Sequence, residues 1–420
     1  MSLDYAKASM ARMSLDSCVK CTICETQCPV SRVTDLFTGP KFVGPQAERF
    51  RVGESVDKSL DYCSGCGICT TACPQGVKIA EINAQARAVM KEGHMPLRDR
   101  IIPETILEGM LMTPVAPVAN VVLANKPIRT VIEKVIGVHR DAPVPKARMQ
   151  TFQGWYKKHK RARDAELGAD YVAPRGPVVF FHGCAGGYFE VETSKATVEV
   201  LEHIGFEVLV PKQGCCGLAH QSNGLFGRAE SQVKKLARQL TEAGKDLPII
   251  GSSGSCAGML RHEAHEILGI DDPVVMDVGS RVVELSEFLL ELIDNGEFPV
   301  AELANWDITI PYHQPCQVKS QGIGMPAIRM METIPGVTVV ESGQPCCGIA
   351  GTYGLKKEKY DIAQRVGKPL FDMVKETNPQ LAACETDTCR WQIAHGTGAK
   401  VVHPVQVIHH ALGLGNIFAK

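Results

Sequence analysis

The sequence predicts a small α-helical domain followed by two copies of one α/β domain. Three observations support this fold class. Eight cysteines lie in two runs within residues 1–95, a helical periodicity follows the second run, and cysteines recur at nearly constant offsets after residue 175. We expect four segments, which are residues 1–95, a connector at 96–175, and two α/β domains at 176–305 and 306–420.

The composition narrows the class of protein before any motif is considered. The chain has 420 residues, 17 cysteines and a formal net charge of -1, and this charge argues against a nucleic-acid binder. Residues 1–12 lack the apolar segment of a secretory signal. We therefore expect reduced thiols, for which metal binding is the more frequent use than disulfides.

Both N-terminal cysteine runs have the spacing C-x2-C-x2-C-x3-C-P, at Cys18–Pro29 and at Cys63–Pro74. This is the spacing of bacterial two-cluster ferredoxins, in which the fourth cysteine of each run ligates the other cluster. Zinc is the alternative, but zinc sites favour two C-x2-C pairs with a long spacer. We assign one 4Fe-4S cluster to Cys18, Cys21, Cys24 and Cys73, and a second to Cys63, Cys66, Cys69 and Cys28.

The residues between and after these runs favour helices. Glu48–Arg51 is expected to open one helix, after a turn-rich loop at residues 39–45. Ile79–Met90 carries Ile, Ala and Val at helical spacing. We therefore expect an α-helical ferredoxin domain rather than the compact β-rich one.

The connector is not expected to span a membrane. Its most apolar part, Ile101–Ala124, is interrupted by Pro103, Pro114 and Pro117. A span needs about 20 consecutive apolar residues, so we expect a soluble or peripheral protein.

The second half of the connector has two interpretations. Ile128–Val138 is amphipathic, and the basic stretch 140–163 contains Phe152, Trp155 and Tyr156. Basic and aromatic residues beside amphipathic segments can dock on an anionic membrane or on a partner protein. Alternatively, this is a solvated linker whose aromatic side chains pack on the neighbouring domain.

From residue 176, short apolar strands alternate with helices, and the order repeats. Strands are expected at 177–181, 206–210, 247–251, 306–312, 337–341 and 380–383. Helices are expected at 192–204, 228–243, 326–333 and 357–376.

The cysteines of this region repeat with the strands. Cys184, Cys215 and Cys256 match Cys316, Cys346 and Cys389 at offsets of 132, 131 and 133 residues, which indicates an internal repeat. Each cysteine follows a strand end, where ligands bind in open α/β sheets. We expect two domains that face each other about a pseudo-twofold axis.

The two repeats offer different ligand sets. The second has five cysteines, more than zinc or one cubane uses, whereas the first has four, which suit zinc, a cubane or a site shared between the domains. Metal-free reactive thiols are the alternative in both. The second set is Cys316, Cys346, Cys347, Cys384 and Cys389, and the first is Cys184, Cys215, Cys216 and Cys256.

A histidine precedes the first cysteine of each repeat, His182 in one and His313 in the other. Such a histidine can orient the cysteine loop through a hydrogen bond. It can also donate a proton to a reduced substrate. We favour the first role, because both repeats keep the histidine although their cysteine counts differ.

The chain resembles the iron–sulfur oxidoreductases with cysteine-rich CCG domains. This family includes the heterodisulfide reductase catalytic subunit, the glycolate and lactate utilisation iron–sulfur subunits, and the iron–sulfur subunit of anaerobic glycerol-3-phosphate dehydrogenase, which the chain resembles most. The stretches that carry the resemblance are Cys28-Pro-Val-Ser-Arg-Val, Gly39-Pro-Lys, Gly44-Pro, Glu48-Arg, Cys346-Cys-Gly-Ile-Ala-Gly-Thr-Tyr-Gly354 and Cys389-Arg-Trp-Gln-Ile393.

The resemblance implies an electron-transfer subunit on the cytoplasmic face of the inner membrane. A flavoprotein partner would oxidise glycerol 3-phosphate, and this chain would pass the electrons to menaquinone. The family also implies a non-cubane 4Fe-4S cluster in the cysteine-rich domain. Its last motif usually reads C-x-x-C, but Thr386 stands at the first of these positions, and Cys384 lies two residues upstream.

Two other functions stay open at this point. The same parts would serve a complex that reduces a heterodisulfide or oxidises lactate or glycolate. A zinc-bound scaffold or a thiol redox sensor would also use clustered cysteines.

Overall fold

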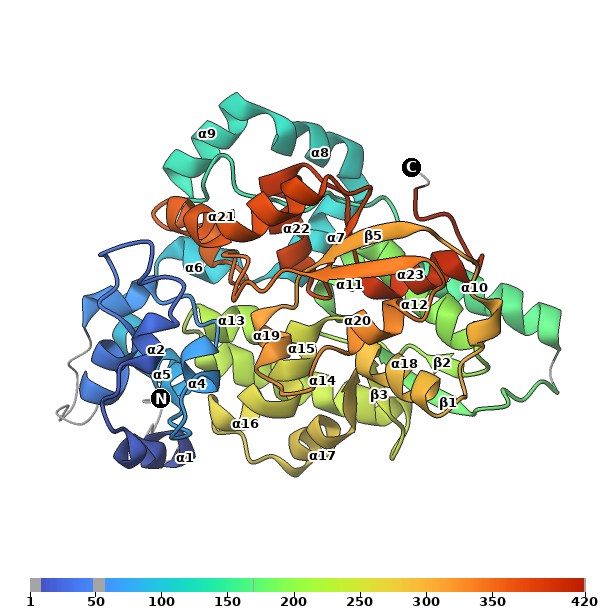
Figure 1. The fold of residues 1–420 in the computed structure, drawn as a ribbon, viewed down its shortest axis with the longest axis horizontal. Coiled ribbons are helices and arrows are strands. Elements are labelled where there is room, and N and C mark those ends of the chain that lie inside the picture. The colour runs from blue at the N-terminus through green and yellow to red at the C-terminus, as the bar shows by residue number, and fades with distance from the viewer. Residues whose placement is uncertain (1–8, 48–56, 169, 419–420) are drawn as a thin grey trace.

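The computed structural model describes residues 9–47, 57–168 and 170–418. The N-terminal helices form one end of the molecule, and two parallel sheets with their helices form most of the rest (Figure 1). In the same view the connector helices α8 and α9 form an outer edge beyond α21 and α22.

The N-terminal part consists of short helices around the two cysteine runs. The long helix α5 (Ile79–Lys91) confirms the helix expected at 79–90, whereas the one expected to open at Glu48–Arg51 lies outside the described residues. No strand occurs among the described residues before 96, as expected for an α-helical domain. The other elements are α1 (Ser9–Met13), η2 (Ser14–Ser17), α2 (Ile23–Thr26), η3 (Phe42–Gln46), η4 (Lys58–Tyr62) and α4 (Ile68–Thr71).

The connector contains a long apolar helical rod, which corrects the sequence-based expectation. Thr105–Ala124 runs for 20 residues with a mean hydropathy of 1.6, and only 11% of its most apolar window is buried. By length and composition alone, this segment could cross a membrane. The rod consists of α7 (Thr105–Met112), η5 (Thr113–Val115) and α8 (Ala116–Ala124).

The prolines do not interrupt this rod because of where they fall. Pro103 precedes α7, whereas Pro114 and Pro117 are the second residues of η5 and α8. A proline is tolerated in the first turn of a helix, where its missing N–H would have no partner in any case. Helical segments with proline in their first turn can therefore follow one another directly in the chain.

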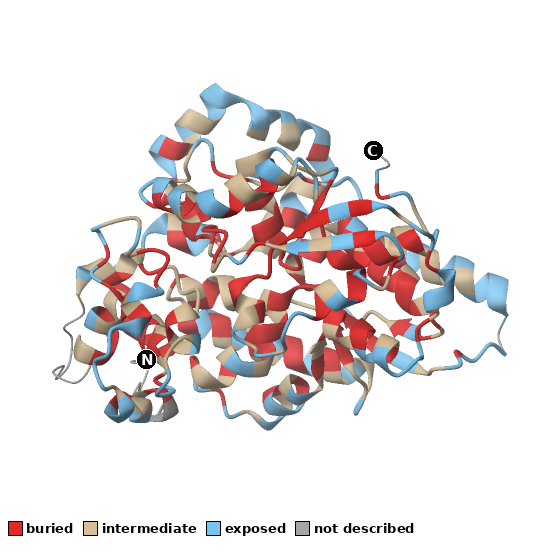
Figure 2. Cartoon of the chain, in the orientation of Figure 1, coloured by how far each residue is buried: buried red, intermediate tan, exposed pale blue. Residues whose placement is uncertain are grey.

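The aromatic residues of the connector pack into the neighbouring domain. In α10 (Phe152–Leu167), Phe152 and Tyr156 are buried, and Trp155 packs against the same core. Their packing agrees with the linker interpretation, in which the aromatic side chains lie against the neighbouring domain. The apolar surface lies instead on α7, α8 and α9 (Lys126–Val135), and Figure 2 shows these helices as largely exposed or intermediate.

The two halves after residue 176 each contain a four-stranded parallel sheet. The strand orders are β2-β1-β3-β4 and β6-β5-β7-β8, so the two sheets have the same topology. The expected strands are confirmed, and each sheet gains one short strand that was not expected. The first sheet contains β1 (Pro177–Phe181), β2 (Glu207–Leu209), β3 (Ile249–Gly251) and β4 (Val282–Glu284). The second contains β5 (Ile308–Tyr312), β6 (Val337–Glu341), β7 (Ala382–Ala383) and β8 (Val401–Val402).

The helices of the two halves cover these sheets, and the four expected helices are confirmed as α12, α14, α20 and α21. The first half contains α11 (Gly183–Tyr188), α12 (Val191–His203), α13 (Leu218–Ser222), α14 (Phe226–Ala243), α15 (Gly254–Gly258), η6 (Met259–Glu263), α16 (Ala264–Glu266), α17 (Pro273–Arg281) and α18 (Leu285–Asp294). The second contains α19 (Cys316–Lys319), α20 (Pro326–Met331), η8 (Tyr353–Leu355), α21 (Tyr360–Thr377), α22 (Asp387–Thr397) and α23 (Pro404–Ala411). The remaining short elements are α6 (Leu97–Ile101) and η7 (Val300–Glu302).

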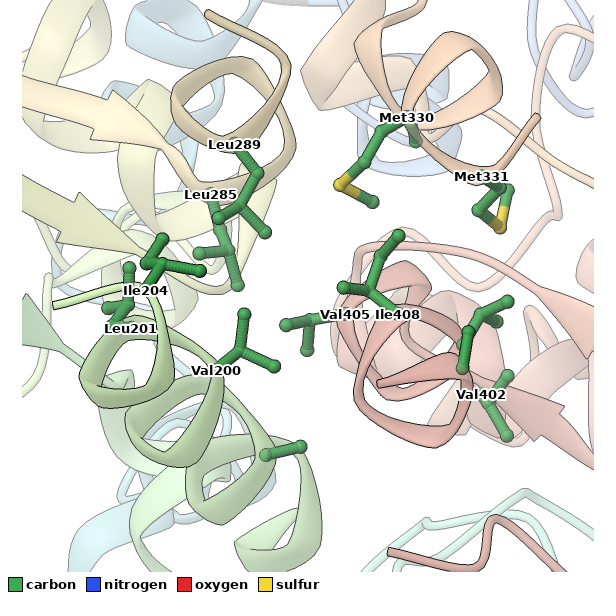
Figure 3. Close-up of a cluster of buried hydrophobic side chains, with 14 of the residues drawn as sticks. Val200, Leu201, Ile204, Leu285, Leu289, Met330, Met331, Val402, Val405 and Ile408 are labelled. Atoms are coloured by element: carbon green, nitrogen blue, oxygen red, sulfur yellow. The ribbon is translucent and has the colours of Figure 1, made fainter. Parts of the chain in front are cut away.

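One hydrophobic core crosses the boundary between the two halves. Val200, Leu285 and Leu289 of the first half belong to the same buried cluster as Val405 and Ile408 of the second. Figure 3 shows these side chains pointing toward one another from facing helices. Each Å² of apolar surface buried in this core stabilises the contact between the two halves by about 25 cal/mol. The two sheets are therefore held in a fixed relation.

Candidate iron–sulfur sites

The two N-terminal cysteine loops share one backbone conformation. Lys20 and Thr22 have φ values of 63° and 68°, and Gly65 and Gly67, at the same places in the second run, have 71° and 78°. Non-glycine residues rarely adopt this left-handed region. The first loop therefore keeps the fold of the second although it lacks the glycines, which indicates that both loops serve the same purpose.

The first group of thiols lies at the surface, and we call it the outer set (Cys18, Cys21, Cys24 and Cys73). Cys21 is exposed, and Cys24 is buried. Burial, then Glu25, and then the other three cysteines raise the pKa of Cys24 to about 11. The structure therefore brings together the four cysteines that the sequence assigns to the first cluster.

The second group lies in the interior, and we call it the inner set (Cys28, Cys63, Cys66 and Cys69). Burial raises the pKa of Cys69 well above its ordinary value, and the charges of Cys66, Cys63 and Cys28 add to it. For Cys66, the largest cause of the raised pKa after burial is Cys346 of the second repeat. The inner set therefore adjoins the second cysteine-rich domain.

The paired cysteines of each repeat sit on a turn that requires glycine. Gly217 and Gly348 have φ values of 85° and 90°, and a side chain on Gly348 would place its Cβ 2.0 Å from the Ala363 carbonyl oxygen. Their N–H groups donate to the first sulfur of each pair, at 3.4 Å for Cys215 and 3.3 Å for Cys346. Neighbouring thiols and this N–H hold the pKa of both first cysteines well below its ordinary value.

The first repeat gathers its four cysteines beyond β1, β2 and β3. Cys215 contacts Cys184 and Cys216, and the sulfur atoms of Cys216 and Cys256 are 3.3 Å apart. His220, which was not predicted from the sequence, helps to lower the pKa of Cys215, and its Nε2 lies 3.3 Å from a carboxylate oxygen of Glu104 in the connector. The sequence offered one signal for His220, which is its place four residues after Cys216. This signal is weak, because the matching position of the second repeat is Gly351.

The second repeat gathers five cysteines in the same way. Cys346 contacts Cys316 and Cys347, and Cys389 contacts both Cys347 and Cys384. All five are buried. Within the described ranges, no three His, Cys, Asp or Glu side chains are arranged to hold a single metal ion.

Thr386 points away from this group of thiols. Its hydroxyl lies 3.3 Å from the hydroxyl of Ser255, across the boundary in the first repeat. Cys384, by contrast, is fully buried beside Cys389. The departure from the usual C-x-x-C motif therefore leaves the number of nearby thiols at five.

A cavity of about 440 Å³ lies between the domains, and we call it the interdomain cavity. It is lined by the connector helix α7 and by all three cysteine-bearing parts of the chain. One wall carries Glu108, whose pKa is raised to about 7 by burial and by Glu104. The cysteines that line the cavity are Cys66, Cys184, Cys215, Cys216, Cys256 and Cys316.

The two candidate histidines make hydrogen bonds to cysteine-bearing loops, His182 to its own loop and His313 to the loop that follows β6. Nδ1 of His182 lies 2.6 Å from the Gly183 carbonyl oxygen, and Nδ1 of His313 lies 3.0 Å from the Ser342 hydroxyl. Burial lowers the pKa of each to about 4. Both rings are therefore neutral near pH 7, and this geometry favours the loop-orienting role over proton donation.

A buried ion pair joins the two repeats next to Cys389. Arg390 is 2% exposed and contacts Glu190 of the first repeat at 2.9 Å and Asp387 at 2.6 Å. The indole N–H of Trp391 also donates to Glu190, at 2.6 Å. The role of Glu190 was not predicted, because only the folded chain brings residues two hundred positions apart into contact.

These features define a class of protein before any relative is considered. Soft thiolate ligands on glycine turns suit iron–sulfur clusters better than hard metal ions. A family model described as a 4Fe-4S dicluster domain matches residues 14–77. A second, described as a cysteine-rich domain, matches residues 178–261 and 310–394. The chain is an iron–sulfur oxidoreductase subunit.

Comparison with curated proteins narrows this class to one family. The chain is 34% identical to the C subunit of the anaerobic glycerol-3-phosphate dehydrogenase of Escherichia coli K12, over 95% of this chain and 99% of the relative. It is 26% identical to the D subunit of the heterodisulfide reductase of Methanosarcina barkeri, over 96% and 95%. Lactate utilization protein A of Oceanobacillus iheyensis is 27% identical over 55% of this chain and 96% of the relative. The chain belongs to the family of the C subunit of anaerobic glycerol-3-phosphate dehydrogenase.

The ion pair beside Cys389 gives a first testable prediction. We expect Glu190→Ala to lower the free energy of unfolding by about 2–4 kcal/mol, because it removes one partner of a buried arginine and the acceptor of an indole N–H. Urea unfolding followed by tryptophan fluorescence measures this loss. Glu192→Ala is the matched control, since Glu192 is exposed and its loss should cost under about 0.5 kcal/mol. Equal losses in the two variants would refute the structural role of Glu190.

Proposed function

We propose that this chain is the iron–sulfur subunit of a membrane-associated anaerobic dehydrogenase. A flavoprotein partner oxidises glycerol 3-phosphate, and this chain conducts the electrons through two 4Fe-4S clusters to the cysteine-rich site and to menaquinone. The observation that carries the proposal is the order of the cysteine groups. The outer set reaches the surface at Cys21, and the inner set reaches the second repeat through Cys66 and Cys346.

In this proposal the outer and inner sets each hold one 4Fe-4S cluster. Such clusters, when bound, supply one-electron transfer without bond rearrangement. The chain supplies sulfur ligands and left-handed loops, and it places Cys21 where a partner protein can approach. The proposal also divides the chain into four parts, which are the ferredoxin-type domain (1–95), the connector (96–175) and the two cysteine-rich domains (176–305 and 306–420).

The second repeat would hold a non-cubane 4Fe-4S cluster on Cys316, Cys346, Cys347, Cys384 and Cys389. The gathering of all five thiols supports this assignment. The first repeat, with four cysteines and His220, would hold an iron–sulfur cluster, zinc or no metal. The shared strand order of the two sheets supports a pseudo-twofold relation between the repeats.

The connector supports the membrane part of the proposal. Leu107, Met110 and Leu111 of α7 are exposed, as are Val118 and Val121 of α8. On its other face α7 packs against the first cysteine-rich domain, and its Thr105 and Glu108 line the interdomain cavity. A helix bound to its domain in this way fits a surface position in the lipid interface better than a span.

This arrangement also suggests a location for the acceptor. One face of α7 would meet lipid while the other borders the cavity, so an apolar quinone could pass from the membrane along this helix. Glu108 can take up and release a proton near neutral pH, because burial and the charge of Glu104 raise its pKa to about 7. Reduction of a quinone to a quinol takes up two electrons and two protons, which makes such a carboxyl useful there.

Two alternatives have specific support. The 26% identity to a heterodisulfide reductase subunit over 96% of the chain favours a complex that acts on a disulfide. The 27% identity to lactate utilization protein A over 55% of the chain favours one that oxidises lactate or, by the same chemistry, glycolate. A zinc-bound scaffold or thiol sensor would need zinc in place of iron at these thiols.

Anaerobic purification with co-expressed neighbouring subunits tests the function. We expect a flavoprotein to copurify, iron and acid-labile sulfide to be present, and glycerol 3-phosphate to drive reduction of a menaquinone analogue. Lactate, glycolate and a heterodisulfide serve as competing substrates and should give no turnover. A complex without flavoprotein and without quinone reduction would contradict the proposal, and zinc at all sites would favour the scaffold.

The second-repeat site has its own test. We expect Cys384→Ser to change the low-temperature paramagnetic spectrum of the second-repeat cluster and to leave both N-terminal clusters intact, because serine oxygen is a harder ligand than thiolate. Thr386→Ser is the matched control, since this hydroxyl faces the first repeat. Unchanged spectra and iron content in Cys384→Ser would show that the site uses only the other four cysteines.

The membrane surface gives a further prediction. Val121 on α8 is 71% exposed, and we expect Val121→Glu to lower binding to anionic liposomes about tenfold or more. Loss of one buried valine costs about 1.5 kcal/mol, which corresponds to about tenfold in a binding constant. Val172→Glu is the control, because Val172 is 83% exposed but belongs to the segment between α10 and β1, not to α7, α8 or α9. Equal cosedimentation of both variants with the wild type would exclude this surface as the membrane contact.

A further inference from the structure

Arg87 is a buried cation that lies against the inner cysteine loop. It projects from α5 and is 7% exposed. Its Nη2 donates to the Cys63 carbonyl oxygen at 2.6 Å, and its Nη1 donates to the Ser222 carbonyl oxygen at 3.2 Å. A Cβ built on Gly65 would lie 3.9 Å from Nη1, so the guanidinium also borders the loop between Cys63 and Cys66.

No carboxylate neutralises this guanidinium in the part of the chain that the structure describes. Both acceptors of its hydrogen bonds are backbone carbonyl groups, and its Nε has no partner. A buried charge without a counter-charge costs several kcal/mol. Arg87 therefore needs a neutralising anion that the described part of the chain does not provide.

The two aspartates near Arg87 are already paired with lysines. Asp61 contacts Lys91 at 3.1 Å and Lys359 at 2.8 Å. Asp99 contacts Lys91 at 2.7 Å and Lys356 at 3.0 Å. The lysines hold the pKa of both aspartates below the ordinary value, although burial alone would raise it. These two carboxylates are therefore not available to Arg87.

We propose that Arg87 is the counter-charge of the cluster held by the inner set, and that it raises the reduction potential of that cluster. This inference rests on the proposed assignment of a 4Fe-4S cluster to Cys28, Cys63, Cys66 and Cys69. Four thiolates make such a cluster anionic overall, and reduction adds one further negative charge. A fixed cation beside the loop stabilises the reduced form more than the oxidised form.

The outer loop has an acidic side chain, not an arginine, beside its buried cysteine. Glu25 lies beside Cys24 and, after burial, is the largest cause of its raised pKa. Its partner Lys41 is 3.5 Å away, so the negative charge is only partly compensated. With an acid at the outer loop and a cation at the inner loop, transfer of one electron from the outer to the inner cluster lowers the free energy. No proton or covalent bond changes in this step.

The test is a reductive titration of the full-length, cluster-loaded chain, followed by paramagnetic resonance under anaerobic conditions. Arg87→Gln keeps an N–H donor but removes the charge. We expect the midpoint potential of the inner cluster to fall by about 59 mV or more, which is a tenfold change in the ratio of oxidised to reduced cluster. The outer cluster should keep its potential in the same sample, which provides an internal reference.

Two variants separate charge from hydrogen-bond geometry. Arg87→Lys keeps the charge and should retain most of the potential of the wild type. Arg32→Gln is the matched control, because Arg32 donates to the Thr26 carbonyl oxygen of the outer loop at 2.7 Å but is exposed to screening water. We expect its effect on the outer cluster to be much smaller than that of Arg87→Gln on the inner one.

The outcomes distinguish this inference from the proposed function. An unchanged inner potential in Arg87→Gln, or an equal fall in Arg87→Lys, would overturn the role of the charge and leave the proposed function standing. Loss of inner-cluster iron in Arg87→Gln but not in Arg87→Lys would support the counter-charge, whereas equal iron loss in both would refute it. Absence of an inner cluster from the wild type would overturn the proposed function and this inference together.

Discussion

The structure depends on a single hydrophobic core that continues from one cysteine-rich half into the other. Val200 and Leu289 on one side meet Val405 and Ile408 on the other, and water is excluded between them. Because both sheets are anchored to this core, the strand ends that carry cysteines are fixed with respect to each other. The polar contacts between the halves, such as the one from Glu190 to Arg390, then act over short distances.

Charged side chains distinguish the two N-terminal cysteine loops within this fixed arrangement. Hydrophobic burial determines which thiols are neighbours, but it does not distinguish one cluster loop from the other, since both have the same backbone conformation. The distinction comes from charged side chains at their edges, with Glu25 and Lys41 at the outer loop and Arg87 at the inner one. Under the proposed function, the same local fold would serve at two positions of one electron path.

Local sequence patterns predicted the elements and which cysteines lie together, but not the contacts between distant segments. The cysteine spacing, the strands and the longer helices follow from residues within a few positions of one another. The rod from Thr105 to Ala124 was missed because proline was treated as a helix breaker, whereas its cost depends on the position within the helix. The strands β4 and β8 were missed because two or three apolar residues carry no periodicity. Arg87 and Glu190 gain their roles only from partners far away in the chain, so no local pattern could reveal them.

The close contact between α7 and the first cysteine-rich domain limits how the molecule can move. Because one hydrophobic core spans the two halves, they are held against rotation away from each other. The connector helix α7 is the part of the cavity wall that lies outside this core. There Gly109 lies so near Tyr188 that an added Cβ would be 2.4 Å from the ring. Because Gly109 has no side chain, the backbone of α7 contacts the Tyr188 ring directly. A larger residue at this position would clash with the ring and displace α7 from the cavity wall.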